Sequence, residues 1–229
     1  MAFFRLEEKH IRPVVFAATG LFLCLAILYF SPADIPHKIS FALATLFVAS
    51  LWLVPWPMSM ALLFSALGDY AGSCGIFLAQ MGFFAVAHIF MIGFFVCRWI
   101  RKVEPDKKLT AKAKGQAFIF LLMTLALLGF VFSKVVPCAP EGIIRTGTGI
   151  YAILISSMLF FALLQRSSLY ALGAVLFVFS DFILAWNKFV EPVEYSRYLI
   201  MVPYYLGQWL LFVRSTPYRI RTNLRTMRF

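Results

Sequence analysis

Residues 168–188 read SLYALGAVLFVFSDFILAWNK. An α-helix needs about 20 mostly apolar residues to cross about 30 Å of hydrocarbon, and this run carries a single acidic side chain, Asp181. A charged group near the middle of a bilayer costs roughly 2.5 to 3.5 kcal/mol on insertion scales. Such a residue therefore faces a protein interior or a wet cavity, and it indicates a functional site.

A second carboxylate, Asp69, lies in a run of the same kind. It directly follows the stretch FSALG at residues 64–68. Of the ten acidic residues in the chain, Asp69 and Asp181 are the two that fall inside apolar runs. Two intramembrane acids indicate that the chain is more than a scaffold.

The composition is that of an integral membrane protein. Hydrophobic residues make up 62% of the 229 positions and charged residues 14%, whereas about 45 to 50% is apolar in a soluble domain. The chain has room for eight spans and little else, so we expect an all-α, polytopic fold in which residues 1–229 form a single bundle of eight transmembrane helices. We place the spans at residues 13–30, 38–54, 57–73, 76–99, 115–136, 143–164, 168–188 and 196–214. The link between the second and third spans is short enough to make them a tight helical hairpin.

The net charge of +11 does not indicate a nucleic-acid partner, because the basic residues lie between the spans rather than on one solvated face. If the N-terminus is cytoplasmic, the inner segments hold 16 Lys and Arg residues and the outer segments hold five. This asymmetry predicts that both termini are cytoplasmic.

Other polar residues are expected in the outer half of the membrane, in the same layer as the two carboxylates. They are Lys38, His88, Tyr204, Tyr205 and Gln208. The histidine could instead be a packing residue bonded to a helix carbonyl, and the tyrosines could be interfacial aromatics. The glutamine could simply join two helices, and the lysine could reach toward the headgroups. Asn187 lies about 20° from Ser180 around its helix and could cap the helix or line the same face.

The sequence lacks the patterns of several other chemistries. It has no Lys in the middle of a span for a retinal Schiff base, no paired-His spacing for a metal, no Gly-x-Ser-x-Gly and no phosphate-binding glycine loop. We therefore expect no metal and no organic cofactor. Cys74 and Cys138 fall in expected outer loops and could pair in an oxidising compartment, while the simpler expectation is four buried free thiols.

Several short motifs taken together resemble a known family. They are Leu67-Gly68-Asp69, Ala87-His88, Gly173-Ala174 followed by Phe179-Ser180-Asp181, and Tyr204-Tyr205-x-x-Gln208. The resemblance is to the lysoplasmalogenase family, also called YhhN, and it covers nearly the whole chain. The family usually shows Lys-Pro near the start of the second span, where this chain has Lys38-Ile39, and we match Lys38 to that lysine.

The resemblance implies a membrane-embedded hydrolase that cleaves the vinyl ether bond of lysoplasmalogens. The products would be a fatty aldehyde and a glycerophospho-alcohol such as glycerophosphoethanolamine or glycerophosphocholine. It also implies a bacterial inner membrane as the location, and a lysophospholipid substrate and membrane lipids as partners. Many relatives are bacterial proteins of unproven substrate, so the reaction class is better supported than the lipid.

The residues fit this chemistry. An acid protonates the alkene carbon distal to the oxygen, and water captures the oxocarbenium ion that results. One carboxylic acid and one carboxylate would serve, so Asp69 and Asp181 are the expected acid/base pair. Lys38, His88, Asn187, Tyr204, Tyr205 and Gln208 are the expected substrate-binding residues.

Two other functions stay open. A proton-coupled transporter would also use intramembrane acids, although the chain shows neither an internal repeat nor a matched pair of broken spans. A lipid-binding membrane protein without catalysis is the third alternative. Release of aldehyde from a lysoplasmalogen separates the hydrolase from both.

Overall fold

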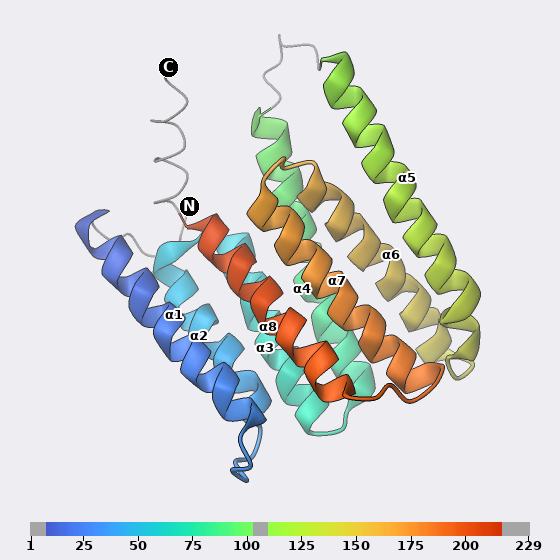
Figure 1. The fold of residues 1–229 in the computed structure, drawn as a ribbon, viewed down its shortest axis with the longest axis horizontal. Helices are drawn as coiled ribbons and strands as arrows, with labels where there is room; N and C mark the ends of the chain where they lie inside the picture. The colour runs from blue at the N-terminus through green and yellow to red at the C-terminus, as the bar shows by residue number, and fades with distance from the viewer. Residues whose placement is uncertain (1–7, 103–109, 217–229) are drawn as a thin grey trace. The chain divides into compact units, whose positions relative to one another are not determined.

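A computed structural model describes residues 8–102 and 110–216 (Figure 1). These residues form eight α-helices and one short 3₁₀ helix, and they contain no β-strand, which confirms the predicted all-α class. The elements are α1 (Glu8–Phe30), α2 (Lys38–Leu53), α3 (Trp56–Ser73), α4 (Phe77–Lys102), α5 (Ala111–Lys134), η1 (Val136–Cys138), α6 (Ile143–Leu163), α7 (Ser168–Phe189) and α8 (Ser196–Ser215).

The helices follow the predicted spans closely, and the largest differences occur where charged residues flank an apolar run. Helix α1 begins at Glu8 instead of residue 13, and α5 begins at Ala111 instead of residue 115. A helix can extend past the hydrocarbon because its backbone bonds do not require apolar side chains. Apolarity therefore located the spans but not the ends of the helices.

Five of the described helices are long and apolar enough to cross a membrane: α1, α4, α5, α6 and α7. Helix α2 is also apolar but has only 16 residues, whereas a crossing takes about 20. The chain is thus a multi-pass membrane protein with eight helices in the described residues. Eight crossings are consistent with these helices and stay a prediction.

The chain forms two compact units, and their boundaries fall inside α4 and α8. Unit one runs to Phe90 and resumes at Gln208, and unit two spans Met91–Gly207. The single transmembrane domain expected from the sequence stays a prediction.

In unit one, α1 lies beside α2 and α2 beside α3 (Figure 1). Only Val54 and Pro55 separate α2 from α3, so the predicted tight hairpin is confirmed. The hydroxyl of Ser59 on α3 donates to the carbonyl of Ser50 on α2 at 3.1 Å, and both residues are fully buried.

Glycines bring α4 close to α3. A β-carbon on Gly68 would lie 3.0 Å from the ring of Phe84, and one on Gly72 would lie 2.6 Å from the side chain of Gln80. The absence of a side chain at Gly68 and Gly72 thus lets the two helices pack closely.

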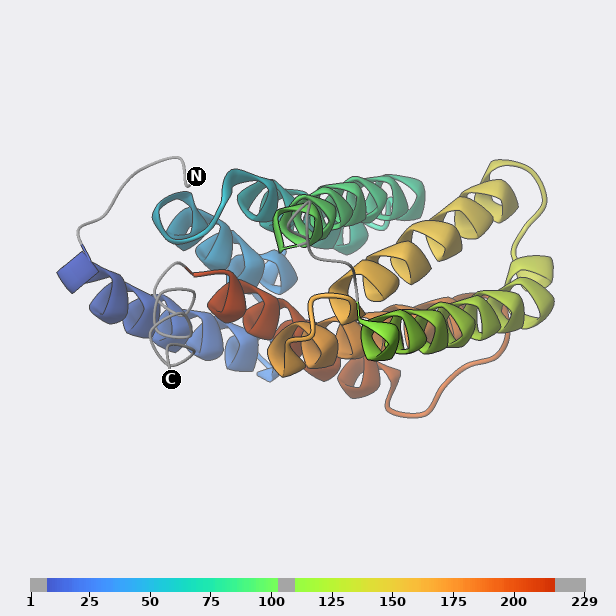
Figure 2. The same ribbon diagram turned by 90° about the horizontal axis from the view of Figure 1, so that it is seen from above.

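In unit two, α5 lies beside α6 and α6 beside α7, as Figures 1 and 2 show from two directions. Helices α7 and α8 approach closely: a β-carbon on Gly207 would lie 2.8 Å from the carbonyl oxygen of Gly173. Gly173 and Gly207 are both glycines, so the backbones of α7 and α8 can approach each other at this point.

All four cysteines are free and exposed: Cys24, Cys74, Cys97 and Cys138. The expectation of free thiols is confirmed, and the expectation that they are buried is wrong. Cys24 and Cys97 lie on apolar helices, where a thiol is apolar enough to occupy a surface that faces lipid. Cys74 and Cys138 lie in the connections that follow α3 and α5.

Candidate active site

Asp69 lies near the end of α3 and is almost completely buried, with 2% of its surface exposed. Ser65 precedes it by one helical turn, so the two side chains share one face of the helix. Ser65 is fully buried. The side chains one turn before and after Asp69 on its own helix, Ser65 and Ser73, are small.

Gln208 on α8 joins that face of α3. Its amide Nε2 donates to the hydroxyl oxygen of Ser65 at 2.9 Å, and both side chains are fully buried. The structure thus brings Gln208 within one helical turn of the position of Asp69 along α3. This bond also joins two helices, as the simpler alternative for Gln208 expected.

His88 on α4 is fully buried, and its Nδ1 lies 2.7 Å from the carbonyl oxygen of Phe84. A carbonyl oxygen only accepts, so Nδ1 carries a proton and donates it. This is the bond to a helix carbonyl that the packing alternative expected. A binding role for His88 stays a prediction.

The packing of α3 against α4 shows which residues of α3 lie at the same level as His88 in unit one. In these antiparallel helices, Gly72 of α3 lies opposite Gln80 of α4, and Gly68, one turn earlier, lies opposite Phe84, one turn later. One further turn in the same directions brings His88 level with Phe64 and Ser65. The ring of Phe64 also lies 5.7 Å from the ring of Phe90 and 6.3 Å from that of Phe83, which agrees with this register. His88 therefore shares a layer with the Ser65–Gln208 bond.

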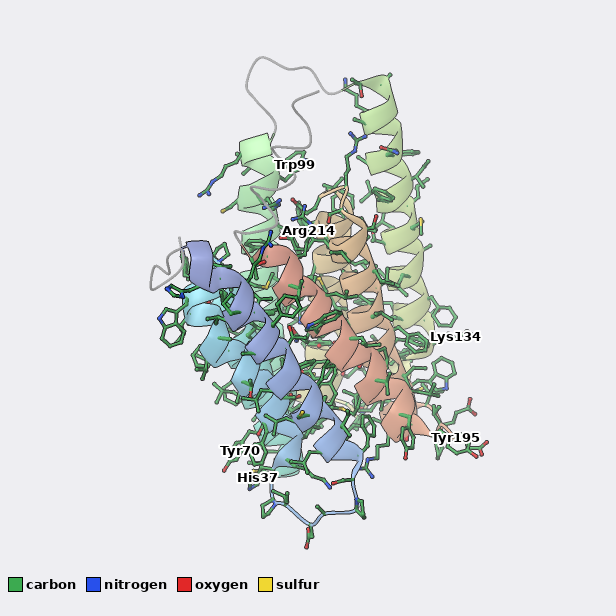
Figure 3. The ribbon with its side chains drawn as sticks, turned by 60° about the vertical axis from the view of Figure 1, so that its left-hand side comes forward. His37, Tyr70, Trp99, Lys134, Tyr195 and Arg214 are labelled. Carbon is green, nitrogen blue, oxygen red and sulfur yellow. The ribbon has the colours of Figure 1, made fainter. Side chains whose placement is uncertain are left out.

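Lys38 holds the connection between α1 and α2. Its ammonium group donates to the carbonyl oxygens of Ser31 at 2.8 Å and Ala33 at 2.6 Å. The adjacent His37 packs its ring against Tyr70, with 4.6 Å between the ring centroids (Figure 3). Lys38 thus has a structural task, and its role in substrate binding stays a prediction.

Asp181 on α7 is held by a neighbouring helix. It is buried, and the hydroxyl of Tyr151 on α6 donates to its Oδ2. Sequence reasoning did not select Tyr151 as a site residue. The available signal was a tyrosine well inside an apolar span, too deep for an interfacial aromatic.

Tyr204 and Tyr205 on α8 are both buried, with 3% of each exposed. The ring of Tyr204 packs edge-on against Phe177 with 5.5 Å between centroids, and Tyr205 lies 5.6 Å from Tyr204. Phe177 precedes Asp181 by one helical turn, so Tyr204 packs on the face of α7 that carries Asp181. Such burial argues against the interfacial alternative for both tyrosines.

Asn187 lies at the end of α7, and its side-chain oxygen accepts a hydrogen bond from the backbone N–H of Val193 at 2.8 Å. It therefore fastens the connection between α7 and α8, which corresponds to the capping alternative. Among the described residues, Asn187 forms no hydrogen bond with Tyr151 or Asp181.

Each unit thus contributes one buried carboxylate. Unit one places a serine, a glutamine and a histidine near the layer of Asp69, and unit two places a tyrosine hydroxyl on Asp181. Within residues 8–102 and 110–216, no three His, Cys, Asp or Glu side chains are grouped so that they could hold a metal ion. Such carboxylates are suited to proton transfer and to the stabilisation of a cation.

The fold and these residues define a multi-pass membrane protein with acid/base groups buried among its helices. The profile of the YhhN family matches residues 35–215, which is most of the chain. The chain belongs to the YhhN family.

Several curated relatives are named as lysoplasmalogenases. Lysoplasmalogenase TMEM86B of Mus musculus is 31% identical over 179 residues, which cover 73% of this chain and 70% of the relative. Lysoplasmalogenase TMEM86A of Homo sapiens is 28% identical over 223 residues, or 86% of each chain. For TMEM86B of Rattus norvegicus, the identity is 32% over 161 residues, which cover 68% of this chain and 60% of the relative. No solved structure matches the chain.

Proposed function

We propose that the chain is a lysoplasmalogenase, an enzyme that hydrolyses the vinyl ether bond of a lysoplasmalogen to a fatty aldehyde and a glycerophospho-alcohol. One observation carries the proposal: Asp69 and Asp181 are both buried in apolar helices of a chain whose relatives are named lysoplasmalogenases. Buried intramembrane acids are costly to insert, so they are expected to have a function.

The proposed reaction uses the two carboxyl groups in turn. One donates its proton to the alkene carbon distal to the ether oxygen, which leaves an oxocarbenium ion. The other carboxylate stabilises this cation and removes a proton from the water that attacks the carbon beside the oxygen. The hemiacetal then gives its hydroxyl proton to the carboxylate that acted as the acid and breaks its bond to the glycerol oxygen. That oxygen takes the proton held by the other carboxyl group, so aldehyde and alcohol are released and both acids return to their starting states.

The contact with Tyr151 supports an assignment of the two roles. Asp181 accepts a hydrogen bond at Oδ2, so it is oriented as an acceptor, which suits the carboxylate that stabilises the cation and activates water. Asp69 is then the proton donor. Tyr151 acts on the reaction through Asp181 and is a positioning residue.

The remaining polar residues are proposed to bind the lipid. Gln208 and His88 are supported by their layer beside Ser65, and Tyr204 and Tyr205 by their packing next to the Asp181 face. Lys38 and Asn187 have less support, because their polar atoms bond to the backbone of connections between helices.

For its location we propose a bacterial inner membrane with both termini in the cytoplasm, because Lys and Arg divide 16 to five in that sense. Reporter fusions at Phe229 and in the segment from Val103 to Thr110 should give the same cytoplasmic signal. Phe229 and residues 103–109 lie outside the described residues. A periplasmic signal from Phe229 would defeat the eight-span topology.

The decisive test of the activity is aldehyde release. Purified protein in detergent or vesicles should release aldehyde from a lysoplasmalogen. It should leave the matched lysolipid with a saturated ether intact, because a saturated ether has no alkene carbon to protonate. Folded protein that releases no aldehyde would overturn the proposal, and proton uptake by vesicles under the same conditions would favour the transporter alternative.

A further inference from the structure

Only one of the two polar atoms of the Gln208 amide has a hydrogen-bond partner among the described residues. Its Nε2 donates to Ser65, but no donor among the described residues reaches its Oε1, although the side chain is fully buried. A buried amide oxygen without a hydrogen bond is costly, and buried groups of this kind normally have a partner. The oxygen therefore points to a ligand that donates to it.

Ser65 offers the complementary group. Its oxygen accepts from Gln208, and its hydroxyl proton has no acceptor in the part of the chain that the structure describes. A serine hydroxyl is both a donor and an acceptor, so this proton remains available. The pair thus presents one donor and one acceptor side by side. A hydroxyl group satisfies both, because it can accept from Ser65 and donate to Gln208.

We propose that the Ser65–Gln208 pair binds the free hydroxyl on the central glycerol carbon of a lysoplasmalogen and so selects lyso lipids over lipids acylated at that position. This inference rests on the proposed function. An ester at the same position has no proton to donate to Gln208, and its acyl chain adds bulk beside two fully buried side chains.

The position of the pair suits this role. Ser65 and Asp69 are one turn apart on the same face of α3, a rise of about 6 Å. In the substrate, five bonds separate the central hydroxyl oxygen from the alkene carbon that is protonated, which is a span of the same order. A lipid whose hydroxyl lies at Ser65 can therefore extend its vinyl ether toward Asp69, the proposed proton donor.

The test compares two synthetic substrates on the same protein. One is a lysoplasmalogen, and the other is identical except that hydrogen replaces the central hydroxyl. We expect the wild-type protein to favour the hydroxyl substrate by about 10- to 100-fold in kcat/KM, the range for one buried hydrogen-bonded group. If the wild type turns over both substrates equally, the inference is overturned and the proposed function stands. If it releases aldehyde from neither, the proposed function itself fails.

Variants identify the residues responsible. Gln208→Met removes the acceptor while keeping a similar volume, and it should reduce the preference by slowing the hydroxyl substrate more than the other. Ser65→Ala should reduce the preference partly, because Gln208 remains. The matched control is Ser59→Ala, since Ser59 is an equally buried serine on α3 that bonds to Ser50 instead, and it should keep the wild-type preference.

The ratio between the two substrates is an internal control for folding, because a loss of active protein lowers both rates equally. A Gln208→Met protein that retains the wild-type ratio would overturn the inference. A retained ratio is also what we expect if the pair holds only a water molecule and no substrate. In that case Gln208→Met would slow the turnover of both substrates by the same factor.

Discussion

The two buried carboxylates have different surroundings. Asp181 in unit two accepts a hydrogen bond from Tyr151 and follows Phe177, which packs against Tyr204. Asp69 in unit one follows Ser65 and adjoins Gly68 on its own helix. One acid is thus oriented by a donor among aromatic rings, and the other lies on a face of small residues.

The difference indicates how a membrane protein can assign two roles to the same type of side chain. A carboxylate that stabilises a cation must keep its orientation, and a fixed donor provides that without movement during the reaction. A proton donor must approach the substrate, and the residues one turn from Asp69 on its own helix, Ser65 and Ser73, are small. The hydrogen bond from Tyr151 is thus the observation that supports the proposed roles, with Asp181 as the carboxylate and Asp69 as the acid.

The largest expected effect comes from removing either acid. Asp69→Asn and Asp181→Asn should each lower vinyl ether hydrolysis by at least about 10² to 10⁴-fold, because an amide neither donates a proton usefully nor carries the charge. Aldehyde release by purified, monodisperse protein measures this effect. Asp34→Asn is the control, since Asp34 is an exposed acid between α1 and α2, and its activity should be unchanged.

Substantial turnover by either Asn variant would contradict the paired mechanism. It would leave open that the chain hydrolyses the same bond with one carboxyl group.

A second prediction concerns the donor on Asp181. Tyr151→Phe removes only the hydroxyl, and we expect a loss of about 10- to 100-fold in kcat, because a hydrogen bond to a charged group is worth about 1.5 to 3 kcal/mol. KM for the lysoplasmalogen should change little, since Tyr151 acts through Asp181. The matched control is Tyr195→Phe, because Tyr195 is an exposed tyrosine between α7 and α8 (Figure 3). Equal activities of the two variants would remove the distinction between the two acids.

A third prediction compares the close helix contacts beside the two acids. Gly207→Ala places a β-carbon against backbone atoms of α7, and it should destabilise the protein by about 1 to 3 kcal/mol. Gly72→Ala meets only the end of the Gln80 side chain, which can move aside, so its effect should be smaller. Thermal unfolding in one detergent measures both.

The control for both glycine variants is Gly93→Ala, because a β-carbon there meets nothing within 4 Å. A melting temperature that falls more for Gly72→Ala than for Gly207→Ala would show that the backbone contact between α7 and α8 is not the tighter one.

The smallest expected effect is at Asn187. Asn187→Ala removes the acceptor for the N–H of Val193 and should cost about 1 kcal/mol of stability, with KM unchanged. Asn187→Asp keeps an acceptor oxygen and should restore most of the stability. A raised KM in the alanine variant would instead support the binding role predicted from the sequence.

The sequence by itself determined the helices and the two acids that are buried within them. Crossing hydrocarbon requires a length and an apolarity that can be read along one segment at a time, so runs such as residues 168–188 matched their helices within a residue or so. Asp69 and Asp181 stood out for the same reason, because a charge inside an apolar run is unfavourable wherever the helix packs.

Only the tertiary structure decided which side chains meet. The bonds from Tyr151 to Asp181 and from Gln208 to Ser65 depend on how each helix is rotated about its axis and how far it is shifted along its neighbour. The partners are 30 and 143 residues apart in the chain, so no local pattern specifies them. Lys38 showed the same limit: the sequence placed it at the start of a helix, and the fold of the preceding connection directed its ammonium group to two carbonyl oxygens.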